Sequence, residues 1–488
     1  MKLSFSVSDG QVNCEGHGVS LWFLPSGRAK QGLSDVGEDA QAMAKRRGFS
    51  GKPKALLTYD RDENEHVVVI SVSPRRGMFH CLETARKAVA ACRKVDPKWV
   101  EMNFPEEGLA PLVDAVTSAW VAAGYEGPKY RAKPKEDKSL TKIHFRVPKS
   151  QIDLVQSVSE KARLVSEGTN LVRELTTMAG NDLTSARYVA LAQEKAKAAG
   201  LASEFYSVDR LKEMKAGAFL AVVQGSGNTG AGILKLSYRP KQPKGKIAFV
   251  GKGITFDTGG NNIKTGGYMY GMNADMAGSA VALASILYAA KRDWPFEVDA
   301  YLAIAENLLG PDSYRPNDVV TALNQKTIEV VDTDAEGRMV LADTLELASQ
   351  SKPDLIMDFA TLTGACVRAL GTRYSGAYTN RRKLISGIMS AGRSSGERVW
   401  PFPPDKDYGR CLKSQVADIK QCRPSGGVDH IESSYFLSQF VDRKIPWVHV
   451  DLSGEENEGG LAHVGGDVTG FGVRFAVAFC ERQFHTPL

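Results

Sequence analysis

The chain has 488 residues, of which 43% are hydrophobic and 24% are charged. These proportions are typical of a globular protein and exclude a fibrous or wholly disordered one. The length exceeds what a single hydrophobic core usually supports, so it predicts two domains. The net charge of +6 arises from 62 basic and 56 acidic residues. So mild an excess does not by itself indicate a nucleic-acid or anionic-lipid partner.

The predicted elements of residues 1–150 alternate between short apolar runs and amphipathic patterns. Strands are expected at 19–25, 54–59 and 66–72, and helices at 83–95 and 107–124. A Pro- and Lys-rich stretch near 127–150 predicts a linker. We therefore expect a smaller N-terminal α/β domain that contains no obvious chemistry.

A long helical segment over 151–185 is expected to connect this domain to the rest of the chain, and a second helix to begin at Thr184 or Ser185. Beyond it, strands alternate with helices. Apolar strands rich in β-branched residues are expected at 246–251, 298–306, 354–362 and 446–454. Such runs are typical of central strands that are covered on both faces. The pattern predicts a larger C-terminal catalytic domain, 186–488, with a mixed, largely parallel sheet flanked by helices.

The cysteines and the apolar runs bear on the location of the protein. Its seven cysteines are far apart and form no Cys-x-x-Cys pair, which is typical of a reducing compartment. The N-terminal segment lacks the apolar stretch of a signal peptide, and no run of about 20 apolar residues predicts a spanning helix. We expect a cytoplasmic protein without a membrane partner.

Charged residues gather after the buried strands, where ligands bind in open α/β sheets. They are Lys252, Asp257, Lys264 and Asp275 after the strand at 246–251, and Asp332, Asp334, Glu336 and Arg338 after the strand-like segment 327–331. Carboxylates placed close together repel one another, so one of them is protonated or cations lie among them. An oxygen-rich site of this kind suits Mg, Mn or Zn, and two such ions can activate a shared water molecule.

The two lysines have two interpretations. Lys252 and Lys264 could be ion-pair partners of the carboxylates, or they could polarise a carbonyl at a developing oxyanion. Acidic loop residues are often merely solvated, but five carboxylates with two lysines and an arginine after buried strands favour a functional site.

The segment 332–343 reads Asp-Thr-Asp-Ala-Glu-Gly-Arg-Met-Val-Leu-Ala-Asp. It resembles the signature of the leucyl (cytosolic) aminopeptidases, which are dinuclear zinc or manganese exopeptidases and have Asn in the first position. The segments 250–264, 305–330 and 359–366 are also similar to blocks of this family. The resemblance is specific over about residues 170–370 and weaker toward the C-terminus.

The resemblance implies a role for each matching residue. Lys252, Asp257, Asp275 and Glu336 would hold the tighter metal ion, and Asp257, Asp334 and Glu336 the more exchangeable one. Lys264 and Arg338 would be catalytic without binding metal, and Arg338 would hold a bicarbonate ion that relays a proton. Met272, Thr361, Leu362 and Gly364 would form the substrate pocket. The ions would be Zn or Mn, with Mg or Co as alternatives.

The implied reaction is the release of N-terminal amino acids, preferably apolar ones such as Leu or Met, from peptides with a free N-terminus. The attacking group would be a hydroxide that bridges the metals, and the protein would be a homohexamer. Asp332, in place of the family's Asn, adds a negative charge for which we expect a modest effect.

Two alternatives to this function remain open from the sequence. The basic segment 129–149 could bind DNA, as some members of the family do, or the site could belong to another two-metal hydrolase such as a phosphatase. A G-x-G-x-x-G match at 225–230 precedes a strand-like run rather than a helix, which argues against a dinucleotide site.

Overall fold

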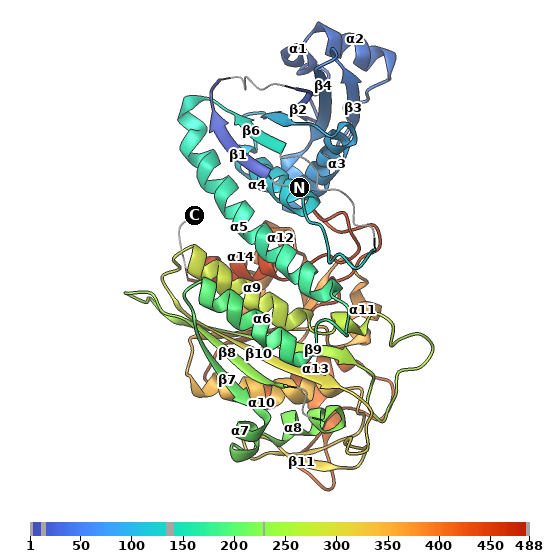
Figure 1. Cartoon of the computed structure of the whole chain (residues 1–488), viewed down its shortest axis with the longest axis vertical. Helices are drawn as coiled ribbons and strands as arrows, with labels where there is room; N and C mark the ends of the chain where they lie inside the picture. The colour runs from blue at the N-terminus through green and yellow to red at the C-terminus, as the bar shows by residue number, and fades with distance from the viewer. Residues whose placement is uncertain (1–2, 11–15, 133–140, 228–229, 485–488) are drawn as a thin grey trace. The chain divides into compact units, whose positions relative to one another are not determined.

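The computed structural model describes residues 3–10, 16–132, 141–227 and 230–484 (Figure 1). Contacts divide the chain into two compact units. Unit 1 comprises Met1–Asn170, Arg393–Glu397 and Glu458–Asp467, and unit 2 comprises Leu171–Gly392, Arg398–Asn457 and Val468–Leu488. The first boundary lies inside helix α5 (Ile152–Thr177). Two short segments of the C-terminal half belong to unit 1, which no local sequence pattern indicates.

Unit 1 is built on a six-stranded sheet in the order β1-β6-β5-β2-β4-β3. Its strands are β1 (Leu3–Ser8), β2 (Gly18–Pro25), β3 (Leu56–Asp60), β4 (Glu65–Val72), β5 (Trp99–Asn103) and β6 (Thr141–Arg146). Neighbours pair in parallel except β3 with β4. Helices α3 (Met78–Cys92) and α4 (Leu109–Ala123) share a core with β2, β4, β5 and β6, and α1 (Leu33–Val36) and α2 (Glu38–Arg46) pack on a second cluster.

The strands and helices predicted for this region are present, but the predicted linker at 127–150 is wrong in part. Strand β6 lies within it and pairs with both β1 and β5. Its side chains Ile143 and Phe145 are fully buried, and they alternate with polar residues as a half-buried strand requires. The surrounding lysines and prolines conceal this short alternation in the sequence.

Unit 2 contains an eight-stranded sheet in the order β15-β14-β17-β13-β9-β10-β8-β7. Its strands are β7 (Ala202–Ser207), β8 (Gly232–Tyr238), β9 (Lys246–Asp257), β10 (Glu297–Asn307), β13 (Leu355–Ala360), β14 (Ser375–Thr379), β15 (Val399–Pro401) and β17 (Trp447–Asp451). The central strands β17, β13, β9 and β10 are parallel, whereas β8 and β14 run antiparallel to their neighbours β10 and β17. This arrangement confirms the predicted mixed, largely parallel sheet.

Helices cover both faces of this sheet (Figure 1). Helix α9 (Ala277–Lys291) packs on one face, and α10 (Glu336–Gln350) packs on the other. The remaining helices of unit 2 are α6 (Ser185–Ala198), α7 (Val208–Glu213), α8 (Gly217–Val223), α11 (Gly364–Leu370), α12 (Ile385–Ser395), α13 (Asp429–Leu437) and α14 (Val473–Gln483). A small sheet is formed by β11 (Val319–Thr321), β12 (Thr327–Glu329) and β16 (Ile419–Lys420).

Two local predictions are confirmed in unit 2. Thr184 caps α6, because its side chain accepts a hydrogen bond from the backbone N–H of Arg187. The glycine-containing segment 225–230 precedes strand β8 and not a helix. None of the helices among the described residues is long and apolar enough to cross a membrane.

Candidate active site

The site begins on β9, where the side chain of Lys252 points toward the first turn of α10. A Cβ atom added to Gly337 would lie 2.6 Å from Cε of Lys252. Any larger residue at position 337 would displace the Lys252 side chain from its two carboxylates, because the lysine stem passes directly against the helix backbone. The glycine between Glu336 and Arg338 in the signature thus makes room for the lysine.

Lys252 is the centre of a buried cluster that we call the inner group, Lys252, Asp275 and Glu336. Its Nζ lies 2.8 Å from Oδ2 of Asp275 and 2.8 Å from Oε1 of Glu336, and it donates to the carbonyl of Thr361 at 3.1 Å. The three side chains are 4%, 6% and 1% exposed. One lysine thus bridges two carboxylates that water scarcely reaches.

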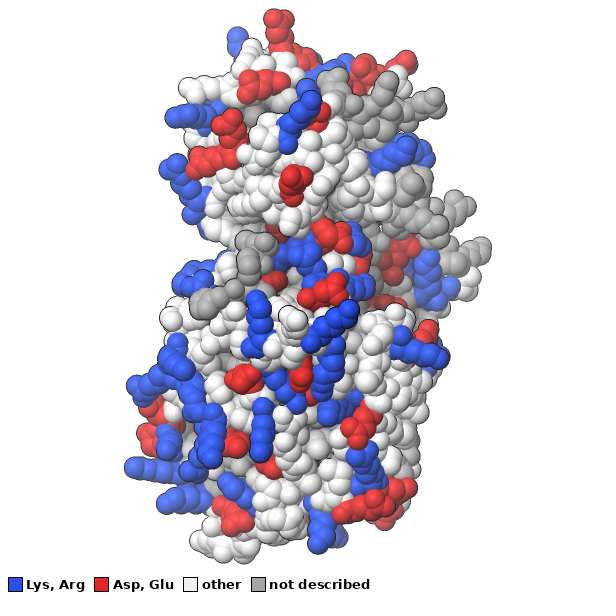
Figure 2. Space-filling view, turned by 90° about the vertical axis from the view of Figure 1, so that its left-hand side faces the viewer, with Lys and Arg blue, Asp and Glu red and all other residues white. Residues whose placement is uncertain are grey.

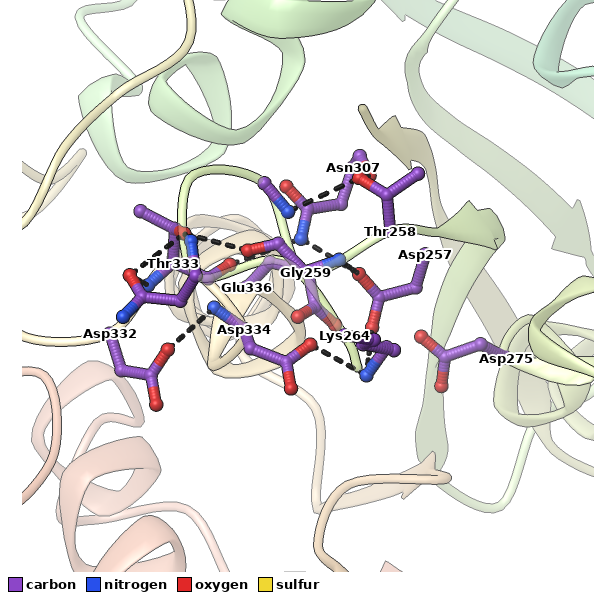
Figure 3. Close-up of polar contacts among 12 residues, drawn as sticks. Asp257, Thr258, Gly259, Lys264, Asp275, Asn307, Asp332, Thr333, Asp334 and Glu336 are labelled. Atoms are coloured by element: carbon purple, nitrogen blue, oxygen red, sulfur yellow. Dashed lines mark hydrogen bonds and ion pairs between the residues drawn. The ribbon is translucent and has the colours of Figure 1, made fainter. Parts of the chain in front are cut away.

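Lys264 is the centre of a second cluster, the outer group, Lys264, Asp257 and Asp334. Its Nζ lies 2.8 Å from Oδ2 of Asp257 and 2.5 Å from Oδ1 of Asp334. Figure 3 shows the carboxylates of Asp257, Asp275 and Asp334 directed toward a common space around this ammonium. Asp334 is 32% exposed, so this group is open to solvent on one side.

The carboxylates of the two groups are suited to hold cations. Asp257, Asp334 and Glu336 each offer an oxygen within 4.8 Å of the others. Oε2 of Glu336 is buried and accepts no hydrogen bond from the described residues. Because buried carboxylate oxygens are rarely left without a partner, and hard divalent ions prefer oxygen ligands, these residues fit a metal centre.

Burial and the mutual repulsion of the carboxylates raise the pKa values of the acids in this site. Burial raises the pKa of Asp275 to about 8, against the attraction of Lys252 and with repulsion from Glu336. Burial and then the charge of Asp257 raise the pKa of Asp334 to about 7, and the same two causes raise that of Glu336. Burial opposes the charged form of Lys252, but its acidic neighbours outweigh burial and raise its pKa. Divalent ions would remove this repulsion.

Two loops are joined beneath the outer group by residues for which the sequence indicated no role. Asn307, at the end of β10, donates from Nδ2 to Oδ1 of Asp257 at 2.7 Å and to the carbonyl of Thr333 at 3.0 Å. The hydroxyl of Thr333 donates to the carbonyl of Gly259 at 2.6 Å. The loop after β9 and the loop before α10 therefore hold each other in place.

Gln421 fixes the signature loop from the other side. Its Oε1 accepts from the backbone N–H groups of Val331 and Asp332, both at 3.1 Å, and its Nε2 donates to the carbonyl of Ala335 at 3.0 Å. Gln421 lies far from the signature in sequence, so no spacing rule could have identified it.

Asp332 supports the loop and does not join the cluster. Its Oδ1 accepts a hydrogen bond from the backbone N–H of Asp334 at 2.9 Å, and its carboxylate points away from Asp257 and Asp275 in Figure 3. This is an Asx-type turn, which the side-chain oxygen of an Asn forms equally well. The departure from the family signature therefore preserves the turn.

A cavity of about 390 Å³ opens beside the two groups. Every residue that the sequence predicted for the site lines it except Glu336 and Arg338; the lining members are Lys252, Asp257, Lys264, Met272, Asp275, Asp334, Thr361, Leu362 and Gly364. The sequence did not predict Glu455 and Glu456, which also line it. Oε1 of Glu455 is buried and makes no hydrogen bond to the described residues.

The loop that carries Thr361 and Leu362 is fixed by Asp451, at the end of β17. Its carboxylate accepts from the backbone N–H groups of Leu362 and Thr363 at 3.2 and 3.3 Å, and from the hydroxyl of Thr363 at 2.7 Å. The hydroxyl of Thr361 donates to Oδ1 of Asp275 at 2.7 Å. The wall of the cavity is thus connected to the inner group.

Arg338 lies in the first turn of α10, but its guanidinium faces Asp429. Its NH2 group lies 2.9 Å from Oδ1 and 2.8 Å from Oδ2 of Asp429, and its NH1 group donates to the carbonyl of Gln421 at 3.2 Å. The Arg338 side chain is only 2% exposed. This predicted catalytic residue is therefore buried, and it is not among the residues that line the cavity.

The chain was compared with known families and structures. The family model described as "Cytosol aminopeptidase family, catalytic domain" matches residues 170–477. The chain belongs to this family. A probable cytosol aminopeptidase of Persephonella marina is 34% identical over 447 residues, covering 89% of each chain. One of Gloeobacter violaceus is 38% identical over 396 residues, covering 78% of this chain and 77% of the relative.

Solved structures agree with the family. The bottromycin maturation enzyme BotP in complex with Mn has a TM-score of 0.84 and 28% identity, over 96% of this chain and 99% of its own. A mutant of tomato leucine aminopeptidase has a TM-score of 0.85 and 27% identity, over 99% and 97% of the two chains. The family and the site together identify the chain as a metal-dependent aminopeptidase, a hydrolase.

Proposed function

We propose that this aminopeptidase removes the first residue from peptides with a free N-terminus by means of two divalent ions. The observation that supports the proposal is the pair of lysine-bridged carboxylate groups, inner and outer, beside one cavity. The alternative of another two-metal hydrolase, such as a phosphatase, is not favoured, because the family of the chain already explains the cluster of carboxylates.

The inner ion would be held by Lys252, Asp257, Asp275 and Glu336, and the outer ion by Asp257, Asp334 and Glu336. The exposure of Asp334 supports easier exchange of the outer ion. Zn or Mn is proposed, and the Mn complex of BotP supports the second. Ions bound there would supply a water molecule of lowered pKa as the nucleophile.

The protein's own side chains would position and polarise the substrate. Lys264 presents its ammonium to the cavity, where it would stabilise the oxyanion that develops on the scissile carbonyl. Asp275 also borders the cavity and would accept a hydrogen bond from the substrate's α-amine. A blocked N-terminus would be a poor ligand for the ion held beside Asp275, because its amide lone pair is delocalised, and this would account for exopeptidase action. Lys252 would bind its ion as a neutral amine, a form that a nearby dication favours.

The first side chain of the substrate would contact Met272, Leu362 and Val367, which line the cavity. This wall supports a preference for apolar residues such as Leu or Met, although one methylene discriminates by only about 1–3 kcal/mol. Burial, and then repulsion from Glu456 and Asp275, raises the pKa of Glu455 to about 8. Near neutral pH Glu455 is thus mainly protonated and is compatible with an apolar ligand.

A panel of substrates tests the proposal. Protein loaded with Zn or Mn should hydrolyse leucyl and methionyl amides faster than lysyl or glutamyl amides, and should not act on N-acetyl-leucyl amide or on phosphate esters. Failure to cleave every unblocked aminoacyl substrate would refute the proposed function.

A cytoplasmic location and a homohexamer belong to the same proposal. The printed name "cytosol aminopeptidase" of the relatives supports the first, and the second follows from the family resemblance alone. For the DNA-binding alternative, residues 133–140 of the basic segment lie outside the described residues. Figure 2 shows Lys and Arg side chains on one face with Asp and Glu side chains among them, so no specific observation favours nucleic acid.

A further inference from the structure

Unit 1 contains a cavity of its own, at the carboxyl ends of the parallel strands β2 and β5. Its volume is about 400 Å³. It is lined by the end of β2 (22–25), by parts of the segment 28–35 that leads into α1, and by residues 103–105 at the end of β5. All of these residues belong to unit 1, and none of them lines the peptidase cavity.

The order of the strands explains why a cavity forms here. β2 and β5 are neighbours in the sheet, but the chain leaves them toward opposite faces. After β2 it forms α1 and α2, which pack on one face with β3 and β4. After β5 it forms α4, which packs with α3 on the other face. Diverging connections leave a crevice outside the carboxyl ends of the two strands, and ligands of open α/β sheets bind in such crevices.

Two hydrogen-bond donors in the wall of this cavity lack an acceptor. The Nε1 atom of Trp22 and the Nδ2 atom of Asn103 are buried, and neither has a hydrogen-bond partner within the part of the chain that the structure describes. Trp22 and Asn103 are partners in the β2–β5 register, so their side chains project from the same face of the sheet. Asn103 is only 7% exposed. Because a buried N–H without an acceptor costs stability, the two donors indicate a ligand that carries acceptors.

The walls of the cavity suit a planar ring. They are formed in part by aromatic and proline side chains at the ends of the two strands, Trp22, Pro25, Phe104 and Pro105. The ring of Phe104 stacks on that of Phe23, with centroids 5.4 Å apart and planes 4° from parallel, so this wall is anchored in the core. Small-molecule pockets combine such apolar walls with a few polar groups that fix orientation. Nucleobases in particular stack on aromatic side chains.

Two exposed charged residues, Arg28 and Asp35, also line the cavity. A guanidinium binds phosphate through paired N–H groups, and a carboxylate accepts hydrogen bonds from ribose hydroxyls in the dinucleotide sites of open α/β sheets. We infer that this cavity binds a nucleobase-bearing small molecule, a nucleoside or a nucleotide, whose ring edge accepts hydrogen bonds from Trp22 and Asn103. This site goes beyond the proposed peptidase function and does not depend on it.

The decisive experiment is calorimetric titration of the intact protein with the four ribonucleosides and with their 5′-mono- and diphosphates. At least one of them should bind saturably, with a Kd below about 1 mM. Trp22→Phe keeps an aromatic ring and removes the N–H, and Asn103→Leu keeps much of the volume and removes the amide. Each should weaken binding about 3–10-fold, which is the effect of losing one hydrogen bond.

Two further variants sharpen the result. Arg28→Gln should weaken the binding of nucleotides and leave that of nucleosides unchanged, which separates recognition of the phosphate from recognition of the base. The matched control is Trp400→Phe, because Trp400 is 49% exposed, lies on β15 of unit 2 and does not line this cavity. It removes an indole N–H elsewhere and should leave every Kd unchanged.

The melting temperature provides a readout that does not require a bound ligand. Asn103→Leu removes a buried amide that has no acceptor, so the ligand-free variant should melt at the same temperature as the wild type or higher. The ligand that binds in the titration should raise the melting temperature of the wild type more than that of the variant. A ligand-free Asn103→Leu that melts several degrees lower would show that the amide already has a partner, and would count against the inference.

The wild type alone can overturn the inference. If no nucleoside or nucleotide binds at about 5 mM, above the Kd expected for a weak site, the cavity holds only water and the inference is wrong. Binding that is unchanged in both Trp22→Phe and Asn103→Leu would also overturn it, since the ligand would then lie elsewhere. Neither outcome affects the proposed peptidase function, because hydrolysis of leucyl amide tests that separately.

Discussion

The inner and outer groups have the same chemistry and differ in burial. In each, one lysine lies within 2.8 Å of two carboxylates. Lys252 is 4% exposed and Lys264 is 14% exposed, and the outer Asp334 reaches 32%. Because water competes for ions and protons only where it has access, the difference in burial supports the proposal that the inner group would hold the tighter ion. Lys264 also lines the cavity, where its ammonium would face a bound substrate.

The largest effect should come from Asp→Asn changes that test this difference. Asp275→Asn should lower kcat/KM by at least about 10³-fold, because a catalytic ion contributes several kcal/mol, and excess metal should not restore activity. Asp334→Asn should lower kcat/KM by a smaller factor, and excess metal should restore part of the lost activity. Elemental analysis measures the bound metal of each variant, and steady-state kinetics measures its activity. Equal losses of activity in the two variants, with equal recovery in excess metal, would contradict a difference between the inner and outer groups.

The next largest loss of activity is expected when the two lysines of the site are replaced. Lys264→Met should lower kcat about 10²–10³-fold while both ions stay bound, since it removes one oxyanion donor. Lys252→Met should instead reduce the metal content. Loss of metal in the Lys264 variant would show that both lysines have the same role.

The melting temperature, measured with and without metal at several pH values, tests the protonation of the two groups. The pKa of Asp275 is raised to about 8 and that of Asp334 to about 7 in the metal-free fold. The stability that these protonated acids contribute is present below about pH 4 and is lost as pH rises through 7 and 8. Metals need the ionised forms, so the increase in Tm on adding Zn or Mn should be several degrees larger at pH 8 than at pH 6. A pH-independent increase would contradict the prediction.

A smaller effect is expected at Glu455, on the cavity wall near the inner group. Glu455→Gln should change kcat/KM for leucyl amide by less than about threefold at pH 7, because the native acid is mainly protonated there. Above pH 8 the variant should become relatively faster on leucyl amide, since the native enzyme then has a buried charge. Parallel pH profiles of the two proteins would refute this interpretation.

The smallest effect should be that of Asp332→Asn. The Asn oxygen can accept the same hydrogen bond from the N–H of Asp334, so kcat/KM should stay within about twofold. Asp332→Ala removes this acceptor and should affect the outer group more. A large change in metal preference for Asp332→Asn would show that its charge acts on the outer ion.

Much of the fold and of the site could be predicted because the informative patterns are short in sequence. The apolar run at 246–251 and the carboxylates at 334 and 336 are local features, and parallel strands bring their carboxyl ends to one edge of a sheet. Strand β6 was missed because its two buried apolar residues, Ile143 and Phe145, lie among lysines and prolines.

The sequence by itself therefore determined the family, the kind of sheet and the set of charged residues. Only the tertiary structure decided which of them meet. It separated Lys252 from Lys264 by burial, turned Asp332 away from the cluster, and placed Gln421 and Asp429 against the signature helix and its loop. The physical reason is that burial and ion pairing depend on which distant elements pack together, and residue spacing along the chain does not specify those contacts.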